Sequence, residues 1–462
     1  MNSDVWAVLL PLALLLLLLA SQVPVALSLG GAGAVGIWLQ DGFEITTNTL
    51  ASIPHSTTGV YTLTLIPMFI LMGLFVSHAG MLAGIFEVAQ RLTRRLPGGL
   101  GIATVAACTF FGGISGSSVA DAATLGRLSV GEMSRRGYDK SYAAAVVAAA
   151  GTVAILIPPS IVLVIYGILT SESVGRLLLA GIVPGLLTAV AYASLIVFFA
   201  LRHEDRGGRT AQKDAADGPG SLEVLSRAYS TDRRTRVFGL LSGVILFGII
   251  VGGLYTGVFT ATEAGAVGAL AALVLSVAFL ITGKSTRKSA DTREAVGGAL
   301  QEAGSLTAMI FALLVGAAIF SHFLVLAGVP SAVTEWIIGL DIPPALVVIL
   351  FLVALLPLGM IIDGLSMLLI MTPLAYPVIS ELGYDGVWFG ILMVKLIEIG
   401  LLTPPVGLNV YVVSGLFKDL KVENVFRRVG PFVVADLVVC ALLFGFPEIV
   451  MFLPDLASPK NG

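Results

Sequence analysis

The chain has 462 residues, of which 57% are hydrophobic and only 12% are charged, and its formal net charge is −3. Ordinary soluble domains carry about 25% charged residues, so this composition excludes a typical water-soluble domain. Nucleic-acid binding is also excluded, because the basic residues lie between apolar segments and form no aromatic-rich basic face. We therefore expect an all-α polytopic membrane protein.

Apolar segments long enough to cross a bilayer recur along the whole chain. The first has no positively charged start and no small-residue cleavage pattern, so we interpret it as a retained span and not a signal peptide. Cys108 and Cys440 lack metal-ligand spacing, which favours small core residues over a disulfide or metal site. The predicted segments are 5–20, 24–39, 60–79, 100–131, 141–169, 176–201, 237–257, 261–281, 303–326, 343–379, 387–416 and 430–453.

Charge between the segments predicts which loops face the cytoplasm, because Lys and Arg are enriched on that side. Most of the 26 basic residues fall into five clusters, near 91–95, 135–140, 202–236, 284–293 and 418–428. The loops between these clusters carry Asp and Glu instead. We expect those loops and both chain termini to lie on the external, periplasmic side.

A polar stretch, Gly112-Gly113-Ile114-Ser115-Gly116-Ser117-Ser118-Val119-Ala120-Asp121, interrupts the fourth apolar segment. Arg95 and Arg135 place both ends of this segment on one side, so the chain must enter and return. Two full spans would have about 15 residues each, or about 22 Å at 1.5 Å per residue, which is short of the roughly 30 Å core. We therefore predict a re-entrant hairpin over about 98–131. Its irregular tip is tolerated only inside protein or beside a wet cavity.

The second half of the chain repeats this pattern. Gly137-Tyr138-Asp139 reappears 246 residues later as Gly383-Tyr384-Asp385, and Ile157-Pro158-Pro159 reappears at the same offset as Thr403-Pro404-Pro405. Segment 343–379 breaks near Asp363 and predicts a second hairpin that enters from outside. We expect two inverted-topology repeats, 1–201 and 237–462, joined by a cytoplasmic linker at 202–236. Each repeat has a hairpin followed by a Pro-Pro-interrupted helix, at 141–169 and 387–416, as in many secondary transporters.

Hairpin tips and broken helices place free helix ends at membrane depth. Their N–H groups attract anions, and their freed carbonyls and hydroxyls can hold Na⁺. Close helix packing explains one pair of small residues, but not four breaks in register across two repeats. The predicted sodium- and substrate-binding residues are Ser115, Gly116, Ser117, Ser118, Gly151, Thr152, Pro158, Asp363, Gly364, Ser366, Gly400, Thr403, Val406, Gly407 and Asn409.

Ionisable residues within apolar segments are functional candidates of lower weight. Asp121 either lines the cavity or caps a local backbone donor, and both alternatives stay open. Lys395 and Glu398 are three residues apart on one predicted helix, which favours a mutual ion pair over a cation-coupling role for Glu398. Glu263 is expected to cap a helix start. His78 and His322 fall near span ends, where an interfacial or core position is favoured.

Three stretches of the chain resemble the large membrane subunit of the TRAP transporters, the tripartite ATP-independent periplasmic transporters. The resemblance also includes Leu96-Pro97-Gly98-Gly99 and covers nearly the whole chain. The three stretches are Phe111-Gly112-Gly113-Ile114-Ser115-Gly116-Ser117-Ser118-Val119-Ala120, Ile157-Pro158-Pro159-Ser160 and Gly400-Leu401-Leu402-Thr403-Pro404-Pro405-Val406-Gly407-Leu408-Asn409.

The resemblance implies Na⁺-coupled uptake of an organic acid across a bacterial inner membrane, without enzymatic activity. It implies two partners, a periplasmic binding protein that delivers substrate and a small four-helix membrane subunit. It also implies an elevator mechanism, with sodium sites at the hairpin tips and broken helices. It assigns no role to Asp121, Arg127 or Lys395.

Two other functions compete with this prediction. Gly113-Ile114-Ser115-Gly116 fits the short pattern of an intramembrane serine protease with Ser115 as nucleophile, for which His78 or His322 would be the base. A protease would have no use for the symmetric second half. The other alternative is a one-component Na⁺/carboxylate symporter of the same architecture, which would work without a binding protein.

Overall fold

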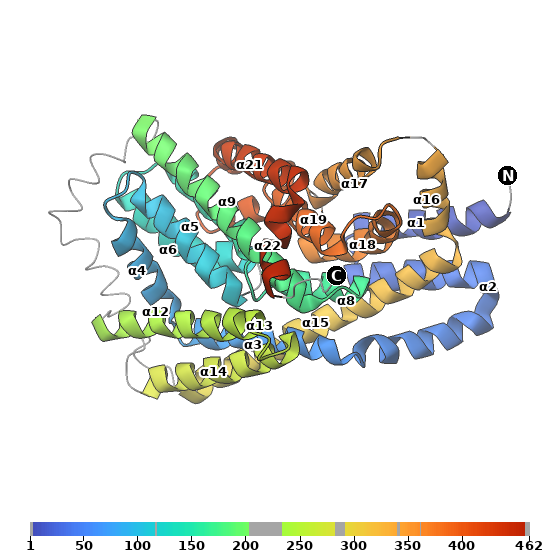
Figure 1. Cartoon of the computed structure of the whole chain (residues 1–462), viewed down its shortest axis with the longest axis horizontal. Coiled ribbons are helices and arrows are strands. Elements are labelled where there is room, and N and C mark those ends of the chain that lie inside the picture. The colour runs from blue at the N-terminus through green and yellow to red at the C-terminus, as the bar shows by residue number, and fades with distance from the viewer. Residues whose placement is uncertain are drawn as a thin grey trace.

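The computed structural model describes residues 3–115, 118–202, 233–281, 292–339, 342–360 and 362–457, and every regular element within these ranges is a helix. The all-α prediction is therefore confirmed for this part of the chain (Figure 1). The first half contains α1 Ser3–Ala20, α2 Val25–Thr58, η1 Tyr61–Thr64, α3 Leu65–His78, α4 Leu82–Thr93, α5 Gly99–Ser115, α6 Ser118–Arg135, α7 Lys140–Ala154, α8 Ile161–Thr170 and α9 Val174–Arg202. The second half contains α12 Arg233–Phe247, η2 Gly248–Gly252, α13 Gly253–Tyr255, α14 Ala261–Ile281, α15 Thr292–Leu326, α16 Val329–Gly339, α17 Pro344–Gly359, α18 Gly364–Glu381, α19 Gly386–Gly400, α20 Leu408–Gly415, α21 Val422–Gly445 and α22 Pro447–Ala457.

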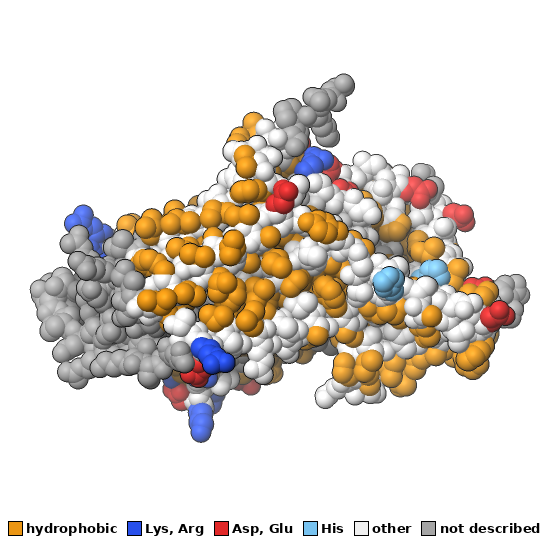
Figure 2. All heavy atoms as spheres, turned by 90° about the horizontal axis from the view of Figure 1, so that it is seen from below, with side chains coloured by type: hydrophobic (Ala, Val, Ile, Leu, Met, Phe, Trp, Pro, Cys, Tyr) orange, Lys and Arg blue, Asp and Glu red, His pale blue; other side chains and the backbone are white. Residues whose placement is uncertain are grey.

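Six helices of the described ranges are long and apolar enough to cross a membrane: Tyr61–His78, Val174–Arg202, Ala261–Ile281, Thr292–Leu326, Gly364–Glu381 and Val422–Gly445. Large apolar side chains on their outer surfaces, such as Leu186 and Val190 of α9, are exposed. Figure 2 shows hydrophobic side chains over a broad face of the molecule, with most of the visible charged side chains near its edges. An apolar surface of this kind is suited to contact with membrane lipid.

Two long helices, α2 and α15, lie side by side and form one flank of the molecule (Figure 1). They approach so closely that a Cβ atom at Gly316 would lie 2.2 Å from the carbonyl oxygen of Ala26. Both helices extend beyond their predicted apolar segments, 24–39 and 303–326. The predictions followed hydropathy alone, whereas the helices continue into polar sequence, and α2 passes through a kink at Gly42 (φ 82°). The amphipathic α4 and the short α16 were missed for the same reason.

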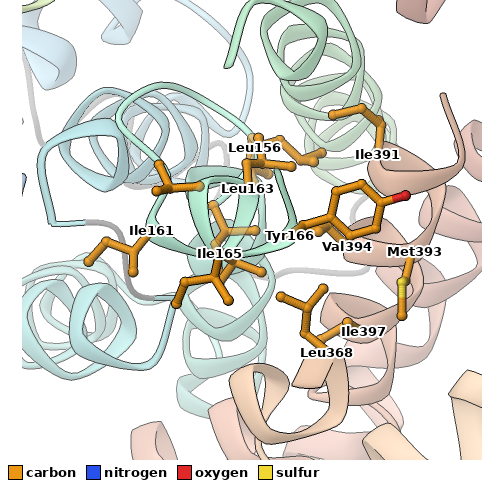
Figure 3. Packing of buried hydrophobic residues seen from close by; sticks show 14 of the residues in the cluster. Leu156, Ile161, Leu163, Ile165, Tyr166, Leu368, Ile391, Met393, Val394 and Ile397 are labelled. Atoms are coloured by element: carbon orange, nitrogen blue, oxygen red, sulfur yellow. The ribbon is translucent and has the colours of Figure 1, made fainter. Parts of the chain in front are cut away.

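Helices α7 and α19 form the centre of the molecule. Every residue of α19 from Val387 to Gly400 is buried, and so is every residue of α7 from Tyr142 to Ala154. Tyr166 of α8 donates a hydrogen bond to the Gly386 carbonyl at 2.8 Å. Figure 3 shows its ring beside Val394 and Met393 of α19. Neither central helix has an exposed side along these residues, and the irregular segment 155–160 after α7 is buried as well, whereas 404–406 after α19 is exposed.

Helix breaks occur at matched places in the two halves. Helix α5 ends at Ser115 and α6 begins at Ser118, while α17 ends at Gly359 and α18 begins at Gly364. The connections after α7 and α19 contain the cis peptide bonds Pro158-Pro159 and Pro404-Pro405. Asp139 and Asp385 cap α7 and α19 in the same way, each accepting a hydrogen bond from a backbone N–H of the first turn. These matches support the two-repeat hypothesis, while the topology across a membrane stays a prediction.

We predict that Gly316→Ala destabilises the protein, because its methyl group would overlap the backbone of α2 at Ala26. Overpacking of this kind costs about 1–3 kcal/mol. Gly304→Ala is the matched control, because it lies on the same helix with nothing within 4 Å of its added Cβ. Thermal unfolding in detergent should show a lowered midpoint for Gly316→Ala and an unchanged or raised one for Gly304→Ala. Equal midpoints would show that the α2–α15 contact is not tight.

Candidate functional site

A cavity of about 830 Å³ lies between the α2–α15 flank and the helix breaks. One wall comes from the start of α2, from α3 and from α15, and includes Ile70, Glu302 and Leu306. The opposite wall comes from α6, α8, α18 and α19. Of the predicted site residues, Ser118, Asp363, Gly364, Ser366 and Glu398 line it. A mostly apolar cavity with a few convergent polar groups is typical of a small-molecule site.

The first helix break contributes Ser118, a buried residue that begins α6. Its carbonyl oxygen would lie 2.8 Å from a Cβ atom at Gly151, so only glycine permits α7 to approach this closely. Gly116, Ser117 and the side chain of Ser115 lie outside the described residues. Asp121 is buried next to Gly112, behind the cavity wall.

The second helix break contributes Asp363, which caps α18. Its carboxylate accepts a hydrogen bond from the Ser366 backbone N–H at 3.1 Å and another from the Ser366 hydroxyl at 2.5 Å. An acidic cap at a helix N-terminus is favourable because it satisfies free N–H groups and complements the helix dipole. Asp363 and Ser366 therefore satisfy each other within this tip.

The break after α19 lies beside the second tip. A Cβ atom at Gly400 would lie 2.7 Å from the Cα of Gly359, so the end of α17 and the end of α19 touch through their backbones. The Thr403 hydroxyl donates to the Ile399 carbonyl at 2.6 Å, and Gly407 begins α20 with a φ of 57°. Val406, in contrast, is 38% exposed.

Asn409 follows this break and is fully buried in the first turn of α20. Neither its amide oxygen nor its amide nitrogen has a hydrogen-bond partner within the structure as described. Buried polar groups are nearly always paired, so an unpaired one requires an explanation such as an absent ion or water. Asn409 is thus an available oxygen ligand at the second break.

At the first broken helix, Thr152 is fully buried and donates a hydrogen bond to the Ala149 carbonyl at 2.7 Å. Pro158 stands in the cis peptide that follows. The predicted residues that the structure describes therefore fall into two sets. One set lines the cavity, as given above. The other set does not line it and lies at the two breaks: Gly151, Thr152, Pro158, Gly400, Thr403, Val406, Gly407 and Asn409.

A buried charge network behind the cavity was not predicted. The Lys395 ammonium of α19 pairs with Asp436 of α21, and both side chains are completely buried. The Tyr192 hydroxyl of α9 donates to the same carboxylate and lies 3.4 Å from the Thr152 hydroxyl. The signal that could have found it is Asp436 itself, an acidic residue within an apolar segment.

The expected ion pair between Lys395 and Glu398 is replaced by the pair with Asp436. The ammonium of Lys395 reaches across to α21, so Glu398 is left without it. Glu398 is 1% exposed and lines the cavity, and neither of its carboxyl oxygens makes a hydrogen bond within the described chain. Ser118 of the first helix break lies close to this carboxyl.

Three further sequence predictions concern residues away from the breaks. Glu263 does cap α14, because its carboxylate accepts hydrogen bonds from the Thr260 N–H at 2.8 Å and the Thr260 hydroxyl at 2.9 Å. His78 is partly exposed and lies 2.9 Å from Glu302 of α15. His322 is exposed on α15. Neither histidine is buried in the core, and their position at the membrane interface stays a prediction.

We predict that Lys395→Met destabilises the protein by roughly 3–5 kcal/mol, because it leaves the Asp436 carboxylate buried without its cation. The double variant Lys395→Met/Asp436→Leu should recover most of this loss, since replacing both buried charges by apolar groups is often neutral. Unfolding in detergent would measure all three free energies. A double variant as unstable as the single one would mean that the pair contributes through something other than its charge.

The model of the DctM component of the tripartite ATP-independent periplasmic transporters matches residues 12–449. A C4-dicarboxylate TRAP transporter large permease protein of Pseudomonas aeruginosa is 34% identical over 93% of this chain and 94% of its own length. A sialic acid TRAP transporter large permease protein of Vibrio cholerae is 33% identical over 86% of this chain and 87% of its own length.

Among solved structures, the Alcanivorax borkumensis YdaH transporter superposes with a TM-score of 0.63. It covers 88% of this chain and 89% of its own, at 15% identity. At that identity the likeness concerns the fold alone, and it agrees with the helical transporter architecture described above. The sequence matches show more than the fold, because they extend over nearly the entire length of both this chain and its relatives. The chain belongs to the DctM component family, the large permease subunits of the tripartite ATP-independent periplasmic transporters, and it is a multi-pass membrane transport protein and not an enzyme.

Proposed function

We propose that this subunit carries an organic carboxylate across a bacterial inner membrane, driven by Na⁺. The observation that supports this most strongly is the cavity itself. It is the place where the tips of both interrupted helix pairs and the end of α19 meet a wall made by α2, α3 and α15. Secondary transporters with inverted repeats place substrate and ion sites at such meeting points.

The substrate class follows from the relatives. The N-terminal turn of α18 borders the cavity, but its N–H groups are capped by Asp363, so this turn is not itself an anion site. Relatives are named for C4-dicarboxylates and sialic acid, which are organic acids. The apolar remainder of the lining, with residues such as Leu313 and Ile161, would enclose the carbon skeleton.

Sodium would bind at the helix breaks. Ser118 supplies a hydroxyl oxygen at the first break, and Asn409 with the carbonyls after Gly400 supplies oxygens at the second. The first set is buried, while the second combines the buried Asn409 with the more exposed backbone of 403–406, and in both sets carbonyls and hydroxyls would replace the water around a cation. One set in each half would give each repeat its own cation site.

The movement would be of the elevator type. The part that holds both interrupted helix pairs would slide against α2, α3 and α15, and so carry the cavity from one side to the other. The broad apolar face in Figure 2 offers room for a small four-helix subunit in the membrane. A periplasmic binding protein would deliver the substrate, with both termini of this chain on the periplasmic side.

The other functions weighed from the sequence have no support. The chain belongs to a transporter family, and His78, one of the two candidate bases, is paired with Glu302. The relatives are named as large permease proteins of TRAP transporters, which argues for a multi-component system and against a one-component symporter.

Reconstitution tests the proposal. Proteoliposomes holding this chain and the small subunit, supplied with the binding protein and succinate or sialic acid, should accumulate the acid when an inward Na⁺ gradient is imposed. Replacing Na⁺ by K⁺ should abolish accumulation, because helix-break oxygens of fixed geometry select by ion size. Accumulation that is equal in both salts would contradict Na⁺ coupling. Accumulation without the binding protein would favour a one-component carrier.

We predict that Ser118→Ala weakens the first cation site. Loss of one uncharged ligand should cost about 0.5–1.5 kcal/mol, so the Na⁺ concentration for half-maximal uptake should rise roughly 3- to 10-fold. Ser194→Ala is the matched control, because that hydroxyl is exposed on α9 and donates to the Val190 carbonyl. A Na⁺ dependence that Ser118→Ala leaves unchanged would place the cation elsewhere.

A further inference from the structure

The cavity wall contains one carboxyl group that has no ion-pair partner among the described residues. The carboxyl of Glu398 is 1% exposed, lies on the cavity wall and has no hydrogen bond of its own within the described residues. Burying an ionised carboxyl without a partner is so unfavourable that such a group either binds a cation or becomes neutral. An intramembrane carboxyl of this kind is first a functional candidate.

The neighbouring charges leave no cation for Glu398. Lys395, one turn earlier on α19, is committed to Asp436, which also accepts from Tyr192. The buried set holds two carboxyls, Asp436 and Glu398, and one ammonium, so it carries a formal charge of −1 when Glu398 is ionised.

The other groups around α19 do not supply the missing charge. Helix α17 has no ionisable side chain, and Cys440 of α21 is a thiol. Tyr166 of α8 and Tyr376 of α18 donate their hydroxyls to Gly386 and Glu172, away from the cavity. Helix α22 carries Glu448 and Asp455, both exposed. Of the two other carboxyls that line the cavity, Asp363 caps α18 and Glu302 pairs with His78.

We propose that Glu398 is a proton-binding site of the substrate cavity, and that it takes up one proton when the carboxylate substrate enters. The inference rests on the proposed transport of an organic acid. A proton needs one oxygen, whereas a Na⁺ ion needs several. Apart from Ser118, the nearby lining consists of apolar residues such as Ile155, Ile161 and Leu401, and the oxygens of Asp363 and Ser366 are bonded to each other.

Uptake of one proton offsets the negative charge of the incoming carboxylate, which gives a physical reason for coupling proton uptake to substrate binding. An ionised Glu398 repels the incoming carboxylate across a cavity of low dielectric, while a protonated one does not and can donate a hydrogen bond to it. The proton would be taken from the periplasmic side with the substrate. It would be released when the cavity opens to the cytoplasm and water reaches the carboxyl again. Proton uptake would thus accompany Na⁺ binding at the helix breaks.

Infrared spectroscopy of the purified chain in lipid tests the proton directly. As the pH is raised, the difference spectrum of the wild type should lose the C=O band of a protonated carboxyl that is absent from Glu398→Gln throughout. Glu423→Gln, which alters an exposed carboxyl at the start of α21, should leave the band in place. A band that persists unchanged in Glu398→Gln would overturn the proposal, and so would its absence from the wild type at every pH.

Uptake in proteoliposomes with both partners tests the coupling. With Na⁺ held constant, wild-type uptake of succinate or sialic acid should fall as the pH rises, approaching tenfold per pH unit once Glu398 is ionised. Glu398→Gln, which is permanently neutral, should keep a flat profile, and Glu398→Asp should keep a dependent one. A shifted Na⁺ requirement with an unchanged pH profile in Glu398→Gln would assign Glu398 to a Na⁺ site and overturn the proposal. Absence of Na⁺-driven uptake in the wild type would refute the proposed function, while the infrared result still decides whether Glu398 binds a proton.

Discussion

The structure depends on one constraint: polar groups in the middle of an apolar molecule must find partners within it. Helices α7 and α19 meet this constraint by being buried along nearly their whole length. The segment around Pro158-Pro159 can therefore unwind without exposing backbone to lipid, whereas Pro404 and Pro405 after α19 are exposed. The tips of the α5–α6 and α17–α18 pairs lie against the ends of α7 and α19, and the cavity lies beside these tips.

The same constraint determines how the buried charged residues are paired. Lys395 and Asp436 satisfy each other and Tyr192, which ties α19, α21 and α9 into one unit. Asp363 is satisfied by the first turn of α18. Glu398 and Asn409 lack hydrogen-bond partners within the described chain and lie beside the cavity and the second break, whereas other unpaired buried groups, such as those of Gln90 and Ser276, lie on other helices. A substrate or an ion would complete the two groups at the site.

Much of this arrangement could be predicted from the sequence, because its signals are local. Hydropathy identifies the membrane-embedded core. Glycine and serine between Arg95 and Arg135 mark the break that separates α5 from α6, and Asp363-Gly364 marks the start of α18. The candidate residues Ser118, Asp363 and Ser366 come from such local breaks, and the structure brings them to one cavity.

What could not be predicted depends on contacts between distant segments. Helix spacing made Glu398 the natural partner of Lys395, but the ammonium reaches Asp436, 41 residues further along the chain. Helices α2 and α15 pack on each other through their apolar parts and continue as helix into polar sequence, which hydropathy does not report. The wall that these helices form opposite the breaks was likewise not evident from the sequence.

The central claim is that the helix breaks carry the cavity from one side of the membrane to the other. Cysteine labelling measures this directly, because both native cysteines are buried. Val119→Cys would place a thiol on the cavity wall at the first tip. We predict that a membrane-impermeant maleimide reaches it from the periplasmic side in one condition of Na⁺ and substrate and from the cytoplasmic side in another. Labelling from a single side under every condition would contradict the account.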